Sequence, residues 1–449
     1  MARGKKTEKA LTAEEKLVQA LVPVEEQPYP VPGNWCWTYL TSGFAECMDS
    51  YREPINATER ASRVGDVPYY GATGQVGWID DFLTNEQLVL VGEDGAPFLD
   101  LLKDKAYIIE GKAWVNNHAH ILRSYYGETG NHYLKNYLNI FDFTGYVNGT
   151  TRLKLTQASL DTIPIPLPPI SEQQRIVDRI ESLFTKLDEA KEKAQAVVDS
   201  FETRKVAIFH KAFTGELTAK WRKSNSRALD SWRTKTIDEI CIDVKVGIVI
   251  KPSQYYTDSI YGTPAFRSAN VRENHIDNFD WVYLNDTGMK ENSRSIVHTG
   301  DVLIVRSGNP GTACVVTEEF DGYNAIDILI AVPNREFVLP EYLCLFTNSP
   351  LGKKSVVEGK RGMALAHFNV KSYSKVEIQL PLLDEQEEII HILQGLMSDE
   401  QQVKENAEAV IEQIDTMKKS ILARAFRGEL GTNDPAEESA VELLKSALN

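Results

Sequence analysis

Two stretches of the chain carry apolar residues that recur in alternating steps of four and three. In the first stretch, 172–213, these positions are Ile176, Ile180, Leu183, Leu187, Ala190, Ala194, Val197 and Phe201. In the second they are Ile389, Leu393, Leu396, Val403, Ala407, Val410, Ile414, Met417 and Ile421. This spacing is typical of a helix that packs against another helix along a narrow seam. We therefore predict two long helices that pair with each other in antiparallel orientation.

The chain also repeats itself once at a constant offset of 213 residues. LPPISEQQRI at 167–176 lies over LPLLDEQEEI at 380–389, and AFTGEL at 212–217 lies over AFRGEL at 425–430. The offset between Trp35 and Trp232 is only 197, so the second globular part is 16 residues longer in its early portion. Each repeat therefore consists of a variable globular half and a helical half of fixed length.

Both predicted long helices have recognisable ends. Each begins after a Leu-Pro pair, with Ser171 and Asp384 as the expected N-caps. Gly215 and Gly428 follow the last apolar positions, where glycine commonly ends a helix.

The remaining segments predict shorter elements. Thr12 and Glu15 match a capping box for a short N-terminal helix, and Asp434-Pro435 opens a last short helix at 437–448. Short β-prone runs, broken by Gly, Pro and Asn, indicate small mixed globular domains; they lie at 87–91, 106–109, 302–306 and 326–332. The expected fold class is α/β (α+β), with two globular domains in tandem repeat separated by two long helices that form an antiparallel coiled coil.

Composition narrows the class of protein. Five cysteines are scattered without a C-x-x-C spacing, which favours reduced thiols over a disulfide framework or a zinc site; they are Cys36, Cys47, Cys241, Cys314 and Cys344. No apolar run is long enough for a membrane span and no signal peptide is evident, so we expect a cytoplasmic protein. The net charge of -15 argues against nonspecific nucleic-acid binding by the chain alone.

The sequence contains no complete catalytic motif of the classes considered. The segment nearest to an adenine methyltransferase motif is Asn309-Pro310-Gly311, which lacks the second proline and the aromatic residue, and no nucleotide P-loop is found. His118 and His120 stand two residues apart on an expected strand, but no third metal ligand is nearby, which favours a structural or hydrogen-bonding role. We predict no catalytic, cofactor or metal site.

Taken together, these motifs resemble the specificity subunit of Type I restriction-modification enzymes. The resemblance rests on the two Leu-Pro-x-x-x-Glu-Gln helix starts, the two AF-x-GEL helix ends, and the tryptophans Trp35 and Trp232 that begin the globular halves. Further segments also resemble such domains, namely GDVPYYGATG at 65–74, GKAWVNNHAH at 111–120 and GDVLIVRSG at 300–308.

The resemblance implies a non-catalytic subunit that binds double-stranded DNA and is bound by two methyltransferase subunits and by restriction subunits. Methylation, with its S-adenosylmethionine cofactor, and cleavage would lie in those partners. The expected parts are an N-terminal helix and Pro-rich linker at 1–34, a first target-recognition domain at 35–170, a first long helix at 171–222, a second target-recognition domain at 223–383, a second long helix at 384–430, and a C-terminal tail at 431–449.

Residues that would contact DNA are sought among exposed polar loop positions, because base edges are read by Arg, Asn and Gln and phosphates are bound by Lys and Arg. The candidates in the first domain are Tyr69, Tyr70, Thr73, Gln75, Asn116, Asn117, Arg152 and Lys154. Those in the second are Arg267, Ser268, Asn270, Arg306, Ser307, Asn309, Lys360, Arg361 and Lys371.

Two charged residues interrupt the apolar seams. Arg204 and Glu400 fall at seam positions, and in an antiparallel pair the numbers of facing residues have a constant sum. If Arg204 faces Glu400, then Phe201 faces Val403, and small residues meet larger ones in most layers. We predict that the two charges pair and fix the register, since an unpaired buried charge is costly.

Three other classes of function remain open at this stage. These are a coiled-coil scaffold or adaptor, the DNA-recognition subunit of a stand-alone methyltransferase, and a subunit of another phage-defence complex.

Overall fold

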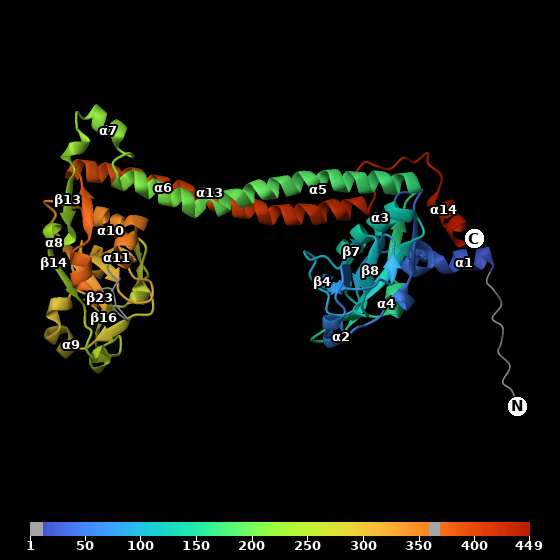
Figure 1. The fold of residues 1–449 in the computed structure, drawn as a ribbon, viewed down its shortest axis with the longest axis horizontal. Helices are drawn as coiled ribbons and strands as arrows, with labels where there is room; N and C mark the ends of the chain where they lie inside the picture. Colours follow the sequence, from blue (N-terminus) through green and yellow to red (C-terminus); the bar gives the residue numbers. More distant parts are fainter. Residues whose placement is uncertain (1–11, 359–368) are drawn as a thin grey trace. The chain divides into compact units, whose positions relative to one another are not determined.

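The computed structural model describes residues 12–358 and 369–449, which form a mixture of helices and strands (Figure 1). Contacts divide the chain into two units: unit 1 is Met1–Gln195 with Glu408–Asn449, and unit 2 is Ala196–Ala407. No helix of the described part is long and apolar enough to cross a membrane.

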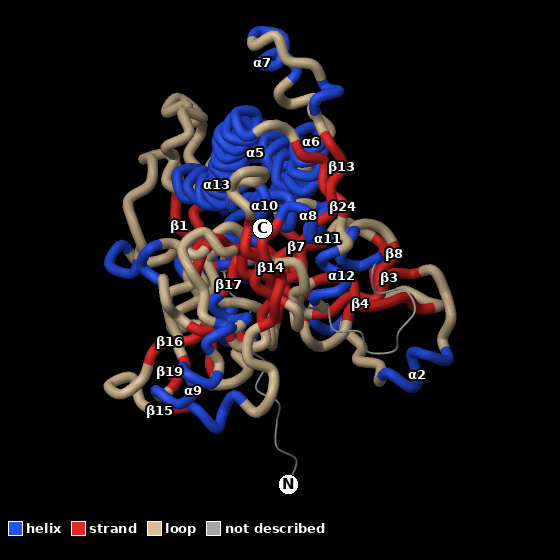
Figure 2. The backbone as a smooth tube through the Cα atoms, turned by 90° about the vertical axis from the view of Figure 1, so that its left-hand side faces the viewer, coloured by secondary structure: helices blue, strands red, loops and turns tan. Residues whose placement is uncertain are grey.

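Unit 1 contains two four-stranded sheets. The first is antiparallel, in the order β2 (Ala45–Cys47), β9 (Ala119–Ser124), β6 (Leu88–Gly92) and β7 (Ala106–Ile109). The second has the order β4 (Gly74–Ile79), β3 (Val67–Gly71), β8 (Lys112–Val115) and β5 (Thr84–Asn85), with β3 and β8 parallel. Figure 2 shows β3, β4 and β8 side by side. Helix α3 (Gly127–Ile140) packs on the first sheet and closes the largest apolar core.

Unit 2 repeats this topology. Its antiparallel sheet has the order β14 (Cys241–Val246), β23 (Ile328–Pro333), β20 (Val302–Val305) and β21 (Ala313–Val315). Its second sheet has the order β15 (Tyr256–Thr257), β19 (Val282–Leu284), β16 (Thr263–Phe266) and β22 (Asn324–Ala325), with β16 and β22 parallel. Helix α10 (Pro340–Asn348) takes the place of α3. Strand β15 has no counterpart in unit 1 and lies within the part of the repeat that the sequence showed to be longer.

Shorter elements complete each unit. In unit 1 they are α2 (Ala57–Ser62), α4 (Gln157–Asp161), the pair β1 (Cys36–Tyr39) and β12 (Pro164–Leu167), and the pair β10 (Val147–Asn148) and β11 (Lys154–Leu155). In unit 2 they are α7 (Ala219–Ser224), α8 (Ile237–Ile240), α9 (Asp286–Glu291), α11 (Pro350–Glu358), α12 (Val370–Ser374), the pair β13 (Arg233–Thr236) and β24 (Glu377–Leu380), and the pair β17 (Val271–Arg272) and β18 (His275–Ile276).

An asparagine near the end of each packing helix holds the edge of its sheet. The Asn139 side chain accepts hydrogen bonds from the backbone N–H groups of Lys105 and Ala106, and donates to the Ala106 carbonyl. Asn348 exchanges the same pair of bonds with Ala313. Both asparagines are buried, so each satisfies backbone groups that would otherwise be left without a partner.

The long helices are α5 (Ile170–Asp199), α6 (Phe201–Phe213) and α13 (Leu383–Ala425). The prediction of one unbroken helix over 172–213 was therefore wrong at Ser200. The Ser200 hydroxyl donates to the Ala196 and Val197 carbonyls, and the Arg204 guanidinium also donates to Val197. These side chains compete with the backbone for helical acceptors, which accounts for the local break.

The predicted N-caps were also wrong, because Ser171 and Asp384 lie inside the first helical turn. The first helical bonds instead run from Gln173 N to the Pro169 carbonyl and from Gln386 N to the Leu382 carbonyl. Each glutamine is fully buried, and its side chain donates back to the carbonyl of the proline five residues before it. The glutamine of the repeated Glu-Gln motif thus ties the helix to the chain that enters it.

The glutamate of this motif holds the tryptophan that begins each globular half. Trp35 Nε1 donates to the Glu172 carboxylate over 2.7 Å, and Trp232 Nε1 donates to Glu385 over 3.0 Å. Both carboxylates are almost completely buried. The repeated Trp and Glu residues are therefore partners in one polar contact.

The segment after each AF-x-GEL motif reaches the same carboxylate. In unit 1, Asn433 Nδ2 and the Thr432 hydroxyl donate to Glu172, over 2.7 and 3.3 Å. In unit 2, Glu385 accepts from the Thr218 hydroxyl over 2.7 Å and pairs with Arg222 over 2.5 Å. Each carboxylate thus joins a domain start, a helix start and a helix end, and Gly215 and Gly428 have the expected positive φ at these ends.

The first and last helices of the described chain, α1 (Ala13–Ala20) and α14 (Ala440–Leu448), pack together in unit 1 (Figure 1). Helix α1 begins with the predicted capping box, in which Thr12 and Glu15 exchange hydrogen bonds. Helix α14 begins three residues later than predicted, with Ser439 as its N-cap. Leu444 and Ala440 join the main core of the unit, so this tail is part of the domain.

Within each unit the long helices pair in antiparallel orientation. In unit 1, Asp188 pairs with Lys418 and Lys191 with Asp415. In unit 2, Arg204 Nε donates to Glu400 Oε2 over 2.7 Å. The predicted contact is thus present in the structure, and its role in setting the register stays a prediction.

The helix pair buries its seam only in part. Leu393 and Ile414 are buried, whereas three other seam residues are exposed by close to half, namely Val403 (46%), Val410 (43%) and Met417 (49%). Two helices can cover only one side of an apolar stripe. The predicted apolar seam is therefore buried at some of its positions, such as Leu393 and Ile414, and half-exposed at others.

Replacing Arg222 with alanine is expected to destabilise unit 2 strongly. The change leaves the Glu385 carboxylate buried without its cation, which costs about 3–5 kcal/mol in comparable cases. Urea unfolding followed by circular dichroism measures the loss. The control is Arg227→Ala, which breaks the exposed pair with Asp384 and is expected to cost at most about 1 kcal/mol. Equal losses in the two variants would contradict the assigned role of Arg222.

A double-mutant cycle tests the contact between the helices in unit 2. Arg204→Ala and Glu400→Ala are expected to show a coupling of about 1 kcal/mol in the free energy of unfolding, because the two groups contact each other and are partly shielded from water. Strictly additive losses would rule out the pair as a register device.

Candidate nucleic-acid interface

Three strands of unit 1 end at one edge of its domain. Asn116 N donates to the Tyr70 carbonyl, which joins the ends of β3 and β8, and Glu93 N donates to the His118 carbonyl, which joins β6. Leu155 N donates to the Glu93 carbonyl and brings β11 to the same place. We call this surface edge 1; it comprises residues 71–75, 92–95, 116–118 and 152–154.

Most of the candidates that the sequence named in the first domain lie at edge 1, and five of them are exposed: Thr73, Gln75, Asn117, Arg152 and Lys154. Tyr69 is a correction, since it is 1% exposed and its hydroxyl contacts the backbone of Ile55 in the core. Asn116 is also buried, and its side chain accepts from His118 N to shape the turn. Tyr70 is half-buried and packs on Tyr107.

Acidic residues that the sequence search passed over hold the basic ones at edge 1. Arg152 pairs with Asp94 over 2.7 Å, and Lys154 pairs with Glu93 over 2.9 Å. Burial raises the pKa of Glu93. Hydrogen bonds from Lys154 and Arg52 lower this pKa by more than burial raises it, so the pKa lies below its ordinary value. The available signal was the position of Glu93 and Asp94 directly after a fully apolar strand, where a loop begins.

Unit 2 has an equivalent surface, edge 2. Ile326 N donates to the Phe266 carbonyl over 2.8 Å, and Asp327 N donates to the Ile248 carbonyl over 3.0 Å. Val305, the last residue of β20, faces Ile328 directly after this segment, so strands β16, β20 and β22 end together, as β3, β6 and β8 do. Edge 2 comprises residues 248–251, 267–270, 306–309 and 326–327.

Edge 2 holds most of the described candidates of the second domain. Asn309 is exposed, Ser268 and Ser307 are half-buried, and Arg306 pairs with Asp327 over 2.8 Å. Arg267 is half-buried and pairs with Asp280 over 2.8 Å.

Asn270 and Lys371 are corrections. Asn270 is fully buried, because its side chain accepts from Arg267 N and donates to two loop carbonyls. Lys371 is exposed on α12, which packs beside α8 and β14 rather than at edge 2. Lys360 and Arg361 lie outside the described residues.

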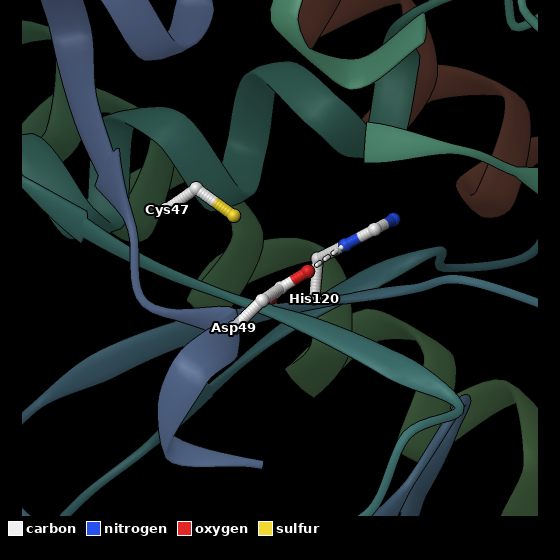
Figure 3. A group of neighbouring side chains, drawn as sticks. All are labelled: Cys47, Asp49 and His120. Carbon is white, nitrogen blue, oxygen red and sulfur yellow. Dashed lines mark hydrogen bonds and ion pairs between the residues drawn. The ribbon is translucent and has the colours of Figure 1, made fainter. Parts of the chain in front are cut away.

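Among the described residues, one trio has the donor atoms of a metal site within reach of one another: Cys47, Asp49 and His120. His120 Nδ1 lies 2.6 Å from an Asp49 oxygen, and its Nε2 lies 2.9 Å from the Leu155 carbonyl. Figure 3 shows Asp49 and His120 directed at each other, joined by a dashed line that does not extend to Cys47. Both ring nitrogens thus lie within hydrogen-bond distance of an oxygen acceptor.

The trio is therefore better explained as a structural contact. Burial raises the pKa of the Cys47 thiol to about 12, so it is protonated at neutral pH and is a poor metal ligand. Asp49 also accepts from Ile121 N and pairs with Arg52. Through His120 and Arg52, the cluster around Asp49 contacts Leu155, next to edge 1, and Glu93, within edge 1. This agrees with the hydrogen-bonding role expected for His120.

Comparison with known proteins agrees with this arrangement. The family model of the Type I restriction modification DNA specificity domain matches residues 49–198 and 230–413. The chain belongs to this family. Each match covers the globular part of one unit and extends into the helix that follows it.

Two relatives illustrate the similarity. The EcoKI specificity subunit of Escherichia coli K12 is 25% identical over 317 residues, which cover 68% of this chain and 66% of the relative. The chain thus spans just under two thirds of that protein. A putative Type I restriction enzyme specificity subunit of Haemophilus influenzae is 28% identical over 380 residues, 82% of this chain and 89% of the relative.

Solved structures share the fold at low sequence identity. The HsdS subunit of Thermoanaerobacter tengcongensis aligns with a TM-score of 0.60 and 18% identity, covering 91% of this chain and all of that one. A chain from a study of assembly and conformational transition in a Type I restriction-modification system aligns with a TM-score of 0.62, also at 18% identity.

The Asp49 contact predicts a defined pH dependence of stability. Burial opposes ionisation of Asp49, but its bonds with His120 and Ile121 N and the charge of Arg52 lower its pKa overall. A lowered pKa stabilises the fold above the ordinary value of 3.8, and this stabilisation is lost as pH falls through the lower folded value. Asp49→Asn is therefore expected to be less stable than the native chain at pH 7, and the difference should shrink at pH 3.

Unfolding free energies of the native chain and of Asp49→Asn at both pH values check this dependence. Asp66→Asn, at an exposed position of the same unit, is the control and should show little difference at either pH. A difference for Asp49→Asn that stays constant between pH 7 and pH 3 would be inconsistent with an ionised, bonded Asp49.

Proposed function

We propose that this chain is the DNA sequence-specificity subunit of a Type I restriction-modification system and reads a bipartite, asymmetric target. The observation that carries the proposal is the double match to the specificity-domain family, with one equivalent edge in each match. Edge 1 and edge 2 rest on the same strand topology but present different side chains. Two readers built alike that differ in their contact residues suit two unlike half-sites.

The proposal includes methyltransferase and restriction subunits as partners. Partner binding is supported by the exposed apolar residues of the helix pair, because contiguous exposed apolar surface commonly marks an interaction site. In unit 1, Leu183, Leu187, Met417 and Ile421 line a shallow groove of about 280 Å³. The net charge of -15 also favours a complex in which a partner supplies much of the phosphate neutralisation.

We assign no catalytic step to this chain. Methylation would use S-adenosylmethionine bound by the methyltransferase partner, and cleavage would lie in the restriction subunit. What the chain contributes is geometry: two domains whose loops select bases, and helices on which enzymes assemble.

Exchanging one globular domain tests the proposal. The chain is expressed with its cognate methyltransferase subunit, and methylated adenines are mapped by long-read sequencing. We expect one motif with two half-sites, and replacing residues 232–383 by the corresponding domain of a relative should change one half-site and leave the other. The reciprocal exchange of residues 35–170 is the matched control.

The outcomes separate the alternatives. A complex that assembles but methylates without sequence preference would favour a scaffold or adaptor. Failure of the methylating complex to bind a co-expressed restriction subunit would favour a stand-alone methyltransferase. A change in both half-sites after a single exchange would show that the domains are not independent readers.

A further inference from the structure

The two edges can be aligned residue by residue from their backbone contacts. The bond from Asn116 N to the Tyr70 carbonyl corresponds to the bond from Ile326 N to the Phe266 carbonyl. A second pair of contacts aligns the neighbouring strands: Asn139 bonds Ala106, which faces Val91, and Asn348 bonds Ala313, which faces Ile304, so Val91 corresponds to Ile304.

The neighbouring strands extend this alignment. Gly92 faces Ala119 in one ladder and Val305 faces Ile328 in the other, so Ala119 corresponds to Ile328 and His118 to Asp327. On the other strand of each ladder, Glu93 corresponds to Arg306.

At these equivalent positions the charges are reversed. In unit 1 the β6 side carries the acid Glu93, which pairs with Lys154 and Arg52, and His118 stands at the position of Asp327. In unit 2 the β20 side carries the base Arg306, which pairs with Asp327. The position on β6 and β20 therefore holds an acid in unit 1 and a base in unit 2.

Exposure decides which member of each pair faces outward. The Glu93 side chain is 13% exposed, against 39% for His118 and 52% for its partner Lys154. In unit 2 the Arg306 side chain is 15% exposed and Asp327 is 46% exposed. Edge 1 thus presents hydrogen-bond donors that an inner carboxylate holds, and edge 2 presents a carboxylate that an inner guanidinium holds.

Asp327 is also held in an uncommon backbone conformation. Its φ is +52°, in the left-handed region that residues other than glycine seldom adopt, although aspartate tolerates it better than most. Its N–H donates to the Ile248 carbonyl, which fixes the conformation. Such a conformation carries a small local cost, and the Asp327 side chain is 46% exposed.

We propose that Asp327 reads a base by accepting a hydrogen bond from the exocyclic amino group of cytosine or adenine in the major groove. This inference rests on the proposed function of the chain. A carboxylate repels phosphates, so an exposed aspartate at a DNA-facing edge has no favourable contact with the backbone of the duplex. The amino groups of cytosine and adenine are the base-edge donors in the major groove.

Arg306 is in this scheme a positioning residue. Its Nη1 donates to Asp327 Oδ1 over 2.8 Å, which orients the carboxylate and leaves its other oxygen to accept from a base. Edge 1, with donors outward, would contact acceptor groups instead. The reversed charges give a physical reason for the two half-sites to differ.

The test uses the complex of the full chain with its methyltransferase subunit and a library of duplexes randomised around the target. Asp327→Asn is expected to lose roughly 10- to 100-fold discrimination at one position, occupied by cytosine or adenine on one strand, in one half-site only. Asp327→Gly, which suits the positive φ, is expected to relax the same position. Retention of the other half-site shows that the complex is folded and bound.

The matched control is Asp321→Asn. Asp321 is, like Asp327, an exposed aspartate of unit 2. Its partner is His298, near the start of β20, whereas the partner of Asp327 is Arg306, which follows the end of β20. This variant should keep the native motif. An unchanged motif in both Asp327 variants would overturn the inference, even if binding to all sequences became uniformly tighter. A native complex with no motif would instead defeat the proposed function itself.

Discussion

The buried carboxylates of Glu172 and Glu385 are the contacts on which the rest of each unit depends. Each is held by the indole of the tryptophan that begins a globular half and by the segment that follows a helix end. A buried carboxylate is tolerated only when its partners are in place, so the domain, the helix start and the helix end must all be positioned together. The repeated motifs of the sequence are the pieces of this one arrangement.

The two carboxylates are satisfied differently. Glu385 has a cationic partner in Arg222, whereas the side chains that bond Glu172 are neutral donors. Neutral donors suffice because several converge on the group and because it lies in the first turn of a helix, where the helix dipole favours negative charge. Equivalent positions in a duplicated chain have therefore kept the acceptor and the tryptophan donor, whereas a cation is present among the other described partners only in unit 2.

The periodic parts of the structure were predictable from sequence because they depend on local rules. The seam spacing gave the two long helices, and the 213-residue offset gave their equal length. The break at Ser200 was not predictable from periodicity, because it comes from a side chain competing for backbone acceptors. The helix starts were misplaced because Ser171 and Asp384 resemble N-caps in sequence. In the structure the side chains of the buried glutamines Gln173 and Gln386 make the hydrogen bonds at the helix starts.

The candidate interface was harder to predict, because it depends on which strand ends meet. Most of the polar loop residues named from the sequence lie at edge 1 and edge 2. The choice of polar loop residues did not distinguish Thr73, which is exposed, from Asn116, which is buried and shapes a turn. It also passed over Glu93, Asp94 and Asp327, since a search for DNA contacts favours basic residues and the pairing of charges appears only in three dimensions.

The pairing of charges at the edges bears on how such a surface would discriminate sequences. Arg152 and Lys154 are exposed enough to reach phosphates, but each must then exchange a carboxylate partner for a phosphate. Exposed ion pairs contribute about 1 kcal/mol or less, so the exchange is nearly neutral, and the released carboxylates then stand near the duplex and repel it. Nonspecific contacts therefore gain little free energy at these edges. Binding is then favoured mainly by the base contacts that a matching sequence supplies. For the proposed function, the acidic residues weaken binding to every sequence, so that the base contacts decide which sequence is bound.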